Sequence, residues 1–303
     1  MRVTFRQYSG QADYALVDRF LIEQYQPNNA DGNWLEPAWE YMHGHPYLDK
    51  TALGKIGIWE EAGQVVAVAH YESRLGEAFF QFRQGYQHLR ETLLDYAETH
   101  LYGVSEKDGR HFLQAYVNDN DPPFQALVQA RGYVKDPDGA RPLAQMIIPQ
   151  SFPAIQLPEG YRLKSMADDF SWDKIHRVLW RGFDHPGEPP ESELEERKTM
   201  QNTPNFQHHL KIMVEAPNGD YAAFCGMWYQ PQKGFAYVEP VATDPHYRRM
   251  GLGRAAVLEG IRRCAELGAK TAYVGSDQAF YLSFGFKVLF TSDGWFKTLE
   301  GWR

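Results

Sequence analysis

The sequence predicts an α/β protein that is built from two related domains, residues 1–150 and 151–303. Two observations lead to this prediction. A chain of 303 residues has room for two domains of about 150 residues each. The order of strand-like and helix-like segments in the first half also recurs in the second half. We expect each domain to be a twisted, mixed β-sheet that is flanked by helices.

The two halves begin in the same way. FRQYSGQADYALVDRFLIEQYQP, which starts at Phe5, aligns with YRLKSMADDFSWDKIHRVLWRGF, which starts at Tyr161. In each copy a short strand-like opening precedes an acidic run with helical periodicity. Each half is therefore expected to open with a strand and a helix.

A hairpin pattern follows in each half. KIGIWEEAGQVVAVAHYE, from Lys55, aligns with KIMVEAPNGDYAAFCGMWYQ, from Lys211. In both copies two apolar runs flank a turn, which contains Gly63 in the first copy and Asn218-Gly219 in the second. This pair and the preceding one have the same offset of 156 positions, which indicates a duplication.

The later parts of the halves correspond with unequal offsets, as insertions and deletions would produce. GYQHLRETLLDYAETHL, from Gly85, matches GLGRAAVLEGIRRCAEL, from Gly251, and FQALVQARGYV, from Phe124, matches FYLSFGFKVL, from Phe280. The Pro-rich segment PQSFPAIQLPEG, residues 149–160, is expected to link the two domains.

The composition limits the classes of function. No stretch approaches the ~20 consecutive apolar residues of a transmembrane helix, and the N-terminal segment lacks the apolar centre of a secretory signal. The two cysteines, Cys225 and Cys264, are too few for a disulfide framework or a thiolate metal site. We therefore expect a cytoplasmic protein that does not bind membranes.

The net charge of −8 argues against general nucleic-acid binding, which needs a basic surface. It favours encounters with cationic ligands such as amines but selects none of them. The pairs His208-His209 and His43-x-His45 have no third ligand at a suitable spacing, so we expect no metal.

Residues 246–257, HYRRMGLGRAAV, contain two glycine patterns. From Gly251 the run fits G-x-G-x-x-A, a form of the dinucleotide-binding fingerprint, with Asp277 as its acidic residue. That fingerprint needs a strand that runs directly into the first glycine, whereas DPHYRRM separates the strand AYVEPVAT from Gly251. Only 26 residues follow Asp277, too few for the rest of a dinucleotide fold. Both observations argue against a nicotinamide or flavin site.

From Arg248 the same run fits R-x-x-G-x-G, with Arg249 and Arg254 as further cations beside the glycines. Glycines allow successive backbone N–H groups to converge on one point, and a helix N-terminus adds partial positive charge. Such a loop could hold the pyrophosphate of an acyl-CoA without a metal ion.

A helix is expected directly after this loop. AAVLEGIRRCAEL places Val257, Ile261 and Cys264 on one face, and Gly268 closes the helix. The helix N-terminus therefore adjoins the glycines, where an anion would bind.

VEPVATDPHYRRMGLGRAAV, together with AFYLSFGF, resembles the GNAT superfamily of N-acetyltransferases. The resemblance covers roughly residues 160 to 290 and implies a catalytic C-terminal domain that uses acetyl-CoA as co-substrate. The first half is similar only in layout, because GEAFFQFRQ precedes Gly85 without R-x-x-G-x-G and Gln125 stands where the second copy has Tyr281. We interpret the first half as a degenerate copy with a binding or structural role.

The resemblance also implies which residues bind acetyl-CoA. Backbone groups of one strand would pair with the pantetheine arm, the glycine loop would hold the pyrophosphate, and an N–H near Ala242 would polarise the thioester carbonyl. Ser276 stands near the position where many relatives have an asparagine that touches the cofactor. The expected set is Val241, Ala242, Thr243, Arg248, Arg249, Met250, Gly251, Leu252, Gly253, Arg254 and Ser276.

Tyr281 matches the tyrosine of the family motif, four residues before the glycine of G-F. Its phenol is expected to give a proton to the departing thiolate. The alternative is an aromatic core residue, since Phe280, Phe284 and Phe286 surround it in the sequence.

Glu239 lies on the strand beside the place where the acyl group is expected. It could take the proton of the attacking amine, directly or through water. Strand alternation places Glu239 and Val241 on one face, and Val238 and Pro240 on the other. The alternative is an exposed carboxylate or a structural ion pair.

The function expected from these residues is acetyl-CoA-dependent N-acetylation of a primary amine, on a small molecule or a protein. The alternative is a non-catalytic module that binds acyl-CoA or takes part in an assembly. The acceptor cleft is expected in residues 179–198, where four residues could select an amine or simply form a solvated acidic loop: Asp184, His185, Glu188 and Glu191. The sequence leaves the acceptor, the acyl length and the oligomeric state open.

Overall fold

A computed structural model describes residues 2–299, and these form two compact units. Unit 1 contains residues 2–42, 47–143 and 288–299, and unit 2 contains residues 43–46 and 144–287. These bounds differ from the expected division at residues 150 and 151. Residues 144–150 belong to unit 2, and the C-terminal segment belongs to unit 1.

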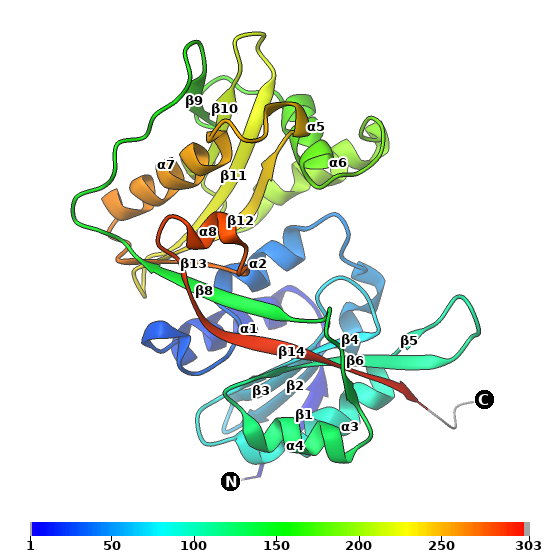
Figure 1. Ribbon diagram of the computed structural model, residues 1–303. Helices are drawn as coiled ribbons and strands as arrows, with labels where there is room; N and C mark the ends of the chain where they lie inside the picture. The colour runs from blue at the N-terminus through cyan, green and yellow to red at the C-terminus, as the bar shows by residue number, and fades with distance from the viewer. Residues whose placement is uncertain (1, 300–303) are drawn as a thin grey trace. The chain divides into compact units, whose positions relative to one another are not determined.

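Unit 1 contains a mixed sheet with the strand order β1-β2-β3-β4-β6-β14 (Figure 1). Its neighbouring strands are antiparallel except for β4 and β6, which are parallel. Two short strands extend the sheet, β5 beside β6 and β7 beside β14. The strands are β1 Thr4–Gln7, β2 Gly57–Glu61, β3 Gln64–His70, β4 Glu77–Phe82, β5 Gly103–Val104, β6 His111–Asn118, β7 Val134–Lys135 and β14 Lys287–Leu299.

Helices cover the sheet of unit 1, and their apolar side chains form its core with the strands. Val17, Trp39 and Leu93 are fully buried in this core. The Asp121 carboxylate accepts a hydrogen bond from Phe124 N and so caps a helix that begins with proline. The helices are α1 Gln11–Gln24, α2 Glu36–Gly44, α3 Arg90–His100 and α4 Pro122–Ala130, and the 3₁₀ turns are η1 Pro27–Asn29, η2 Lys50–Lys55 and η3 Gln87–Leu89.

Unit 2 repeats this layout, with the strand order β9-β10-β11-β12-β13-β8. Its neighbouring strands are antiparallel except for β12 and β13, which are parallel. The strands are β8 Arg141–Ile147, β9 Arg162–Ser165, β10 Lys211–Glu215, β11 Tyr221–Gln230, β12 Phe235–Thr243 and β13 Thr271–Val274.

Two helices of unit 2, α5 and α7, pack on its sheet and belong to separate hydrophobic clusters. The predicted face of α7 is confirmed, because Val257, Ile261 and Cys264 are all completely buried. A Cβ atom at Gly260 would collide with Met227, so glycine lets α7 approach the sheet closely. The helices are α5 Trp172–Gly182, α6 Glu191–Thr199, α7 Leu252–Glu266 and α8 Ala279–Leu282, and the 3₁₀ turns are η4 Met200–Asn202, η5 His208–Leu210 and η6 Pro245–Tyr247.

The predicted correspondences between the halves are confirmed element by element. β1–α1 matches β9–α5, the β2–β3 hairpin matches β10–β11, and α3 matches α7. The last strand of each sheet, however, comes from the other half of the sequence. β8 pairs with β13, and β14 pairs with β6. Because the two units have similar folds, a strand from the other half can take this position without disturbing the strand pairing within either sheet.

The two cysteines lie in the interior of unit 2. Cys225 and Cys264 are free thiols without surface exposure. Burial raises the pKa of both, to about 12 for Cys264. Within residues 2–299, no helix is both long and apolar enough to cross a bilayer, and no three His, Cys, Asp or Glu side chains form a group able to hold a metal ion.

The packing of α7 predicts a large loss of stability for Ile261→Ala. Removal of this completely buried side chain loses apolar burial and leaves a cavity, so the free energy of unfolding should fall by about 2–5 kcal/mol in chemical denaturation. Leu267→Ala, at a side chain that is 43% exposed beside the same helix, should change it by less than about 0.5 kcal/mol. Equal losses would contradict this account of the core.

Candidate active site

A cleft of about 820 Å³ opens in unit 2 where β12 and β13 separate. Their parallel pairing ends at Val238 and Val274. Beyond that point, residues 239 and 241–243 of β12 and residues 275–276 after β13 line the cleft. The carboxyl ends of parallel strands in an open α/β sheet are a common place for a ligand.

A β-bulge in the neighbouring strand shapes the β12 side of the cleft. The register between β11 and β12 shifts between Cys225 and Met227. A Cβ atom at Gly226, within this bulge, would collide with the Glu239 carbonyl oxygen. The same oxygen accepts a hydrogen bond from Trp228 Nε1 at 2.9 Å. The backbone at Glu239 is therefore held tightly by β11.

The glycine loop connects β12 to α7 at the mouth of the cleft. Arg249 and Gly251 have left-handed backbone conformations, with φ of 68° and 79°. No described residue accepts a hydrogen bond from the N–H of Gly251, Leu252 or Gly253, as is usual for the first turn of a helix. A Cβ atom at Gly253 would lie 2.6 Å from Thr243 Oγ1, so the helix start adjoins the strand end.

Arg248 is partly exposed, and its guanidinium is bonded to three acceptors of the protein. Its guanidinium donates hydrogen bonds to the Gly182 carbonyl at 3.0 Å, the Asp184 carboxylate at 2.8 Å and the Thr243 carbonyl at 3.3 Å. These bonds join the end of α5 to the end of β12. Arg248 lines the cleft, and its contacts suit a residue that positions the loop.

The structure brings together nearly all of the predicted cofactor residues. Ser276 lines the cleft, and its Oγ accepts a hydrogen bond from Gln278 N at 3.2 Å. Met250 does not line it; its side chain is 40% exposed, and its Sδ lies 3.8 Å from Tyr161 Oη. The predicted residues that line the cleft are Val241, Ala242, Thr243, Arg248, Arg249, Gly251, Leu252, Gly253, Arg254 and Ser276.

Tyr281 lines the cleft from α8 and is also packed among aromatic rings. Its ring centroid lies 4.8 Å from that of Phe280 and 5.9 Å from that of Phe286. Burial raises the pKa of its phenol above the ordinary value, and the nearby Cys225 and Glu239 raise it further. The structure therefore combines the core position of Tyr281 with access to the cleft.

Glu239, Val241 and Thr243 are half-buried and line the cleft, whereas Val238, which also lines it, and Pro240 are buried. This pattern confirms the predicted alternation along the strand. Glu239 also lines a second, mostly apolar pocket of about 20 Å³. Glu239 thus lies between the two spaces.

The second pocket contains two cations that the sequence did not single out. Lys211 is almost completely buried; its Nζ lies 3.5 Å from the Trp228 ring centroid and donates to the Met227 carbonyl at 2.7 Å. Arg197 Nε donates to His176 Nδ1 at 2.8 Å. Lys211 lies in a strand and Arg197 in a helix, and nothing in the neighbouring sequence marks either residue as part of a site.

In the acidic loop that was expected to line the acceptor cleft, two carboxylates form ion pairs with arginines of unit 2. Glu188 forms ion pairs with Arg177 and Arg181. His185 stacks on Trp180 with ring centroids 4.4 Å apart. Asp184 lines the cleft but is bonded to Arg248. The sequence analysis did not predict that the cleft is also lined by Gly182, Phe183, Tyr247 and Gln278. It named Phe280 only as an aromatic neighbour of Tyr281, but Phe280 lines the cleft too.

Asp244 caps the turn Pro245–Tyr247, which precedes the glycine loop. Burial would raise the pKa of its carboxyl, but hydrogen bonds from the His246 backbone and side chain and from Arg181 outweigh burial and lower it. The carboxylate therefore stays ionised and holds the turn that precedes the arginines.

Comparisons with known proteins agree with this geometry. Residues 172–286 match the model of the acetyltransferase (GNAT) family. A mycothiol acetyltransferase of Kineococcus radiotolerans is 25% identical over 174 residues, which are 54% of this chain and 54% of that protein. The match thus spans about half the length of this curated relative.

Two solved structures resemble the whole chain. A GCN5-related N-acetyltransferase from Sphaerobacter thermophilus superposes with a TM-score of 0.67 at 17% identity, over 98% of this chain and 95% of that one. A tandem GNAT protein from the clavulanic acid biosynthesis pathway superposes with a TM-score of 0.64 at 13% identity, over the full length of both. Residues 172–286 therefore form a GNAT acetyltransferase domain, within a chain that has the fold of a tandem GNAT protein.

Proposed function

We propose that this protein transfers the acetyl group of acetyl-CoA to a primary amine, in the cleft of unit 2. The observation that carries the proposal is that Glu239 and Tyr281 line the same cleft as the glycine loop and its arginines (residues 248–254, the arginine–glycine loop). A candidate base and a candidate acid thus adjoin a candidate anion site. We also propose that unit 2 is the catalytic copy and that unit 1 is a degenerate copy.

The residues of the cleft fit acetyl-CoA. N–H groups of the first turn of α7 would hold the pyrophosphate, with the charges of Arg249 and Arg254 beside it. A Cβ atom at Gly251 would meet nothing within 4 Å, so phosphate oxygens can approach the backbone there. The β12 backbone beyond Val238 no longer pairs with β13 and would pair with the pantetheine arm.

In the proposed reaction the amine nitrogen attacks the thioester carbonyl carbon. A C–N bond forms, the C–S bond breaks, and CoA leaves as a thiolate that must gain a proton. The amine must lose a proton, because the product is a neutral amide. A backbone N–H of β12 near Ala242 would stabilise the oxyanion that forms on the carbonyl oxygen.

Glu239 would accept the proton of the amine, directly or through water. Its place on the wall of the cleft suits a group that takes the proton of an amine bound there. Tyr281 would protonate the thiolate. Its raised pKa keeps the phenol protonated throughout the neutral range, which a proton donor requires.

A calorimetric titration with acetyl-CoA, beside NAD as a control, tests the cofactor. We expect one site for acetyl-CoA and none for NAD, because unit 1 lacks the arginine–glycine loop. Release of CoA that increases with an added amine, across a panel of polyamines, aminosugars, amino acids and peptides, separates an enzyme from a non-catalytic acyl-CoA-binding module. Binding of NAD alone would falsify the proposal.

Tyr281→Phe removes the proton donor and keeps the aromatic packing. The turnover number should fall about 10²–10⁴-fold, while the affinity for acetyl-CoA stays unchanged. Tyr247→Phe is the matched control, since Tyr247 also lines the cleft but its hydroxyl is bonded to Asn218. An unchanged turnover number in Tyr281→Phe would remove Tyr281 from the mechanism.

Glu239→Gln tests the base through the pH dependence of the rate. In the native enzyme, activity should rise with pH as the base loses its proton, and the raised pKa of Tyr281 should prevent an alkaline decline below about pH 10. The variant should be slower at neutral pH and lose the part of the acidic limb that comes from Glu239. Glu188→Gln, on an exposed loop carboxylate, should keep the native profile. A pH–rate profile in Glu239→Gln that is unchanged from that of the native enzyme would exclude Glu239 as the base.

A further inference from the structure

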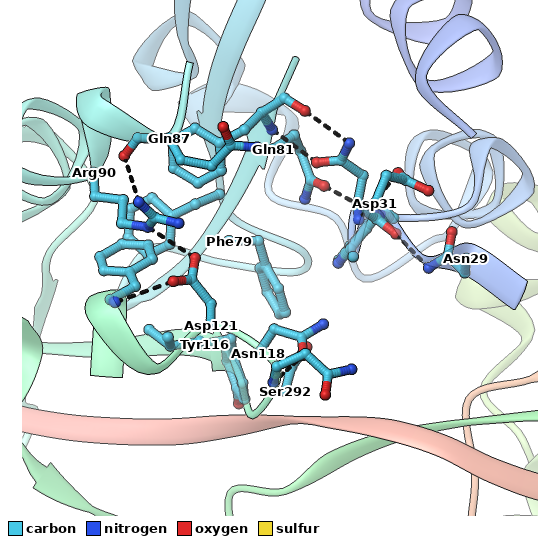
Figure 2. A pocket seen from close by; sticks show the side chains of 18 of the residues that line it. Asn29, Asp31, Phe79, Gln81, Gln87, Arg90, Tyr116, Asn118, Asp121 and Ser292 are labelled. Atoms are coloured by element: carbon cyan, nitrogen blue, oxygen red, sulfur yellow. Dashed lines mark hydrogen bonds and ion pairs between the residues drawn. The ribbon is translucent and has the colours of Figure 1, made fainter. Parts of the chain in front are cut away.

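Unit 1 has its own cavity at the position that corresponds to the cleft of unit 2. β4 and β6 pair in parallel only at Glu77–Gln114 and Ala78–Ala115. Beyond these pairs, residues 79–82 and 116–118 of the two strands line a cavity of about 280 Å³, the unit-1 cavity (Figure 2). The carboxyl ends of parallel strands are a common place for a ligand, so we examined the charge and the chemistry of this cavity.

The charged side chains that line the unit-1 cavity do not balance. They are the carboxylates of Asp31 and Asp121 and the guanidinium of Arg90, two negative charges against one positive charge. Arg90 Nε donates to Asp121 Oδ2 at 2.8 Å, so its charge is matched by Asp121. Figure 2 shows this pair on one side of Phe79 and Asp31 on the other. One formal negative charge is therefore left at Asp31.

Only hydrogen bonds compensate for the burial of the Asp31 carboxylate. Its Oδ1 accepts from Gln26 N at 3.0 Å, and its Oδ2 accepts from Asn33 N at 3.3 Å. Within residues 2–299 it forms no ion pair. Burial raises the pKa of the Asp31 carboxyl, and the hydrogen bonds offset only part of this effect. A cation beside Asp31 would stabilise its ionised form.

Asp31 can still accept a hydrogen bond from a ligand. The residue lines the cavity and is half-buried rather than sealed in the core. Its bond from Gln26 N lies at the protein surface. A carboxylate has about four lone-pair sites on its two oxygens, and the two backbone bonds use only part of this capacity. An N–H group with a positive charge suits the remainder, because charge-assisted hydrogen bonds are the stronger kind.

Aromatic side chains line the same cavity. Trp34, three residues after Asp31, is half-buried, and its ring centroid lies 4.8 Å from that of Phe79. Tyr116, from β6, stacks on Phe79 with centroids 4.4 Å apart. The faces of aromatic rings attract cations, tryptophan most strongly, and proteins use such rings to recognise ammonium groups. The unbalanced carboxylate and the aromatic lining therefore favour the same class of ligand, an organic cation.

Other parts of the cavity limit which cation fits. A metal ion needs several oxygen ligands at once, whereas among the described residues no three His, Cys, Asp or Glu side chains form such a group. The Asn33 side chain occupies the β4 edge, since it donates to the Phe82 carbonyl at 2.9 Å and accepts from the Phe82 N–H at 2.7 Å. An extended arm would have to displace it. A volume of about 280 Å³ is near the lower end of small-molecule sites, which suits an ammonium group on a short carbon chain.

We propose that the unit-1 cavity is a binding site for a small organic ammonium ion, whose positive charge pairs with the Asp31 carboxylate beside the Trp34 ring. The site is separate from the proposed acetyl-transfer cleft and does not depend on its activity. Unit 1 would then be a domain that recognises amines or quaternary ammonium compounds.

The test is ligand-observed NMR of the full-length protein with small molecules that differ in charge. The cation n-butylammonium, the neutral 1-butanol and the anion butyrate share a four-carbon chain, and choline represents the quaternary ammonium compounds. At least one of the two cations should bind to the native protein. 1-Butanol and butyrate should bind about tenfold more weakly or not at all, because neither can pair with Asp31.

Asp31→Asn tests the carboxylate directly. The variant keeps the size of the side chain and an oxygen that can accept a backbone N–H, but it loses the charge. It should bind the cation about tenfold more weakly than the native protein does. Asp138→Asn is the matched control, because Asp138 is an exposed carboxylate of unit 1 outside the cavity and its loss changes the net charge equally. This control should bind the cation as the native protein does.

Several outcomes would overturn the proposal: neither cation binds, 1-butanol binds as tightly as n-butylammonium, or Asp31→Asn binds the cation no more weakly than Asp138→Asn does. A thermal melt shows whether Asp31→Asn is folded. If it is not, a structure of the native protein with the bound cation decides the matter. A cationic nitrogen beside the Asp31 carboxylate would support the proposal, and a cation bound only in unit 2 would refute it.

Discussion

The separation of two parallel strands within a mainly antiparallel sheet is the constraint on which the rest of unit 2 depends. β12 and β13 stay paired as far as Val238 and Val274 and then part, so one edge of β12 is left for a ligand. The bulge at Gly226 and the Trp228–Glu239 hydrogen bond hold that part of β12 in place. The buried face of α7 fixes the helix start against the same strand.

The electrostatics of the cleft follow from this geometry. The first turn of α7 presents N–H groups that no described residue uses, and Arg248 ties the loop to the end of α5. Burial among aromatic rings, which also raises the pKa of Tyr281, would cost little for a group that works as a neutral donor. One packing arrangement thus places a helix N-terminus, arginines and a protonated phenol in the same cleft.

Unit 1 has the same strand separation with different side chains. Asn33 occupies the strand edge that is open in unit 2, and Arg90 is paired with Asp121. The two units therefore share a strand layout, while the residues at the carboxyl ends of their strands differ. A fold shared by two domains sets where a ligand can bind, and the side chains at that place decide which ligand it is.

The sequence by itself determined the elements, the duplication, the glycine loop and the tyrosine motif, because periodicity, turn residues and motif spacing are local properties. Met250 does not line the cleft, and loop spacing alone does not reveal which side chains face a ligand. Only the tertiary structure decided that β8 and β14 join the sheets of the opposite halves, since a strand pattern does not specify its partner. It also decided the setting of Lys211 and the pairing of Asn33 with Phe82, because these contacts join residues far apart in the chain.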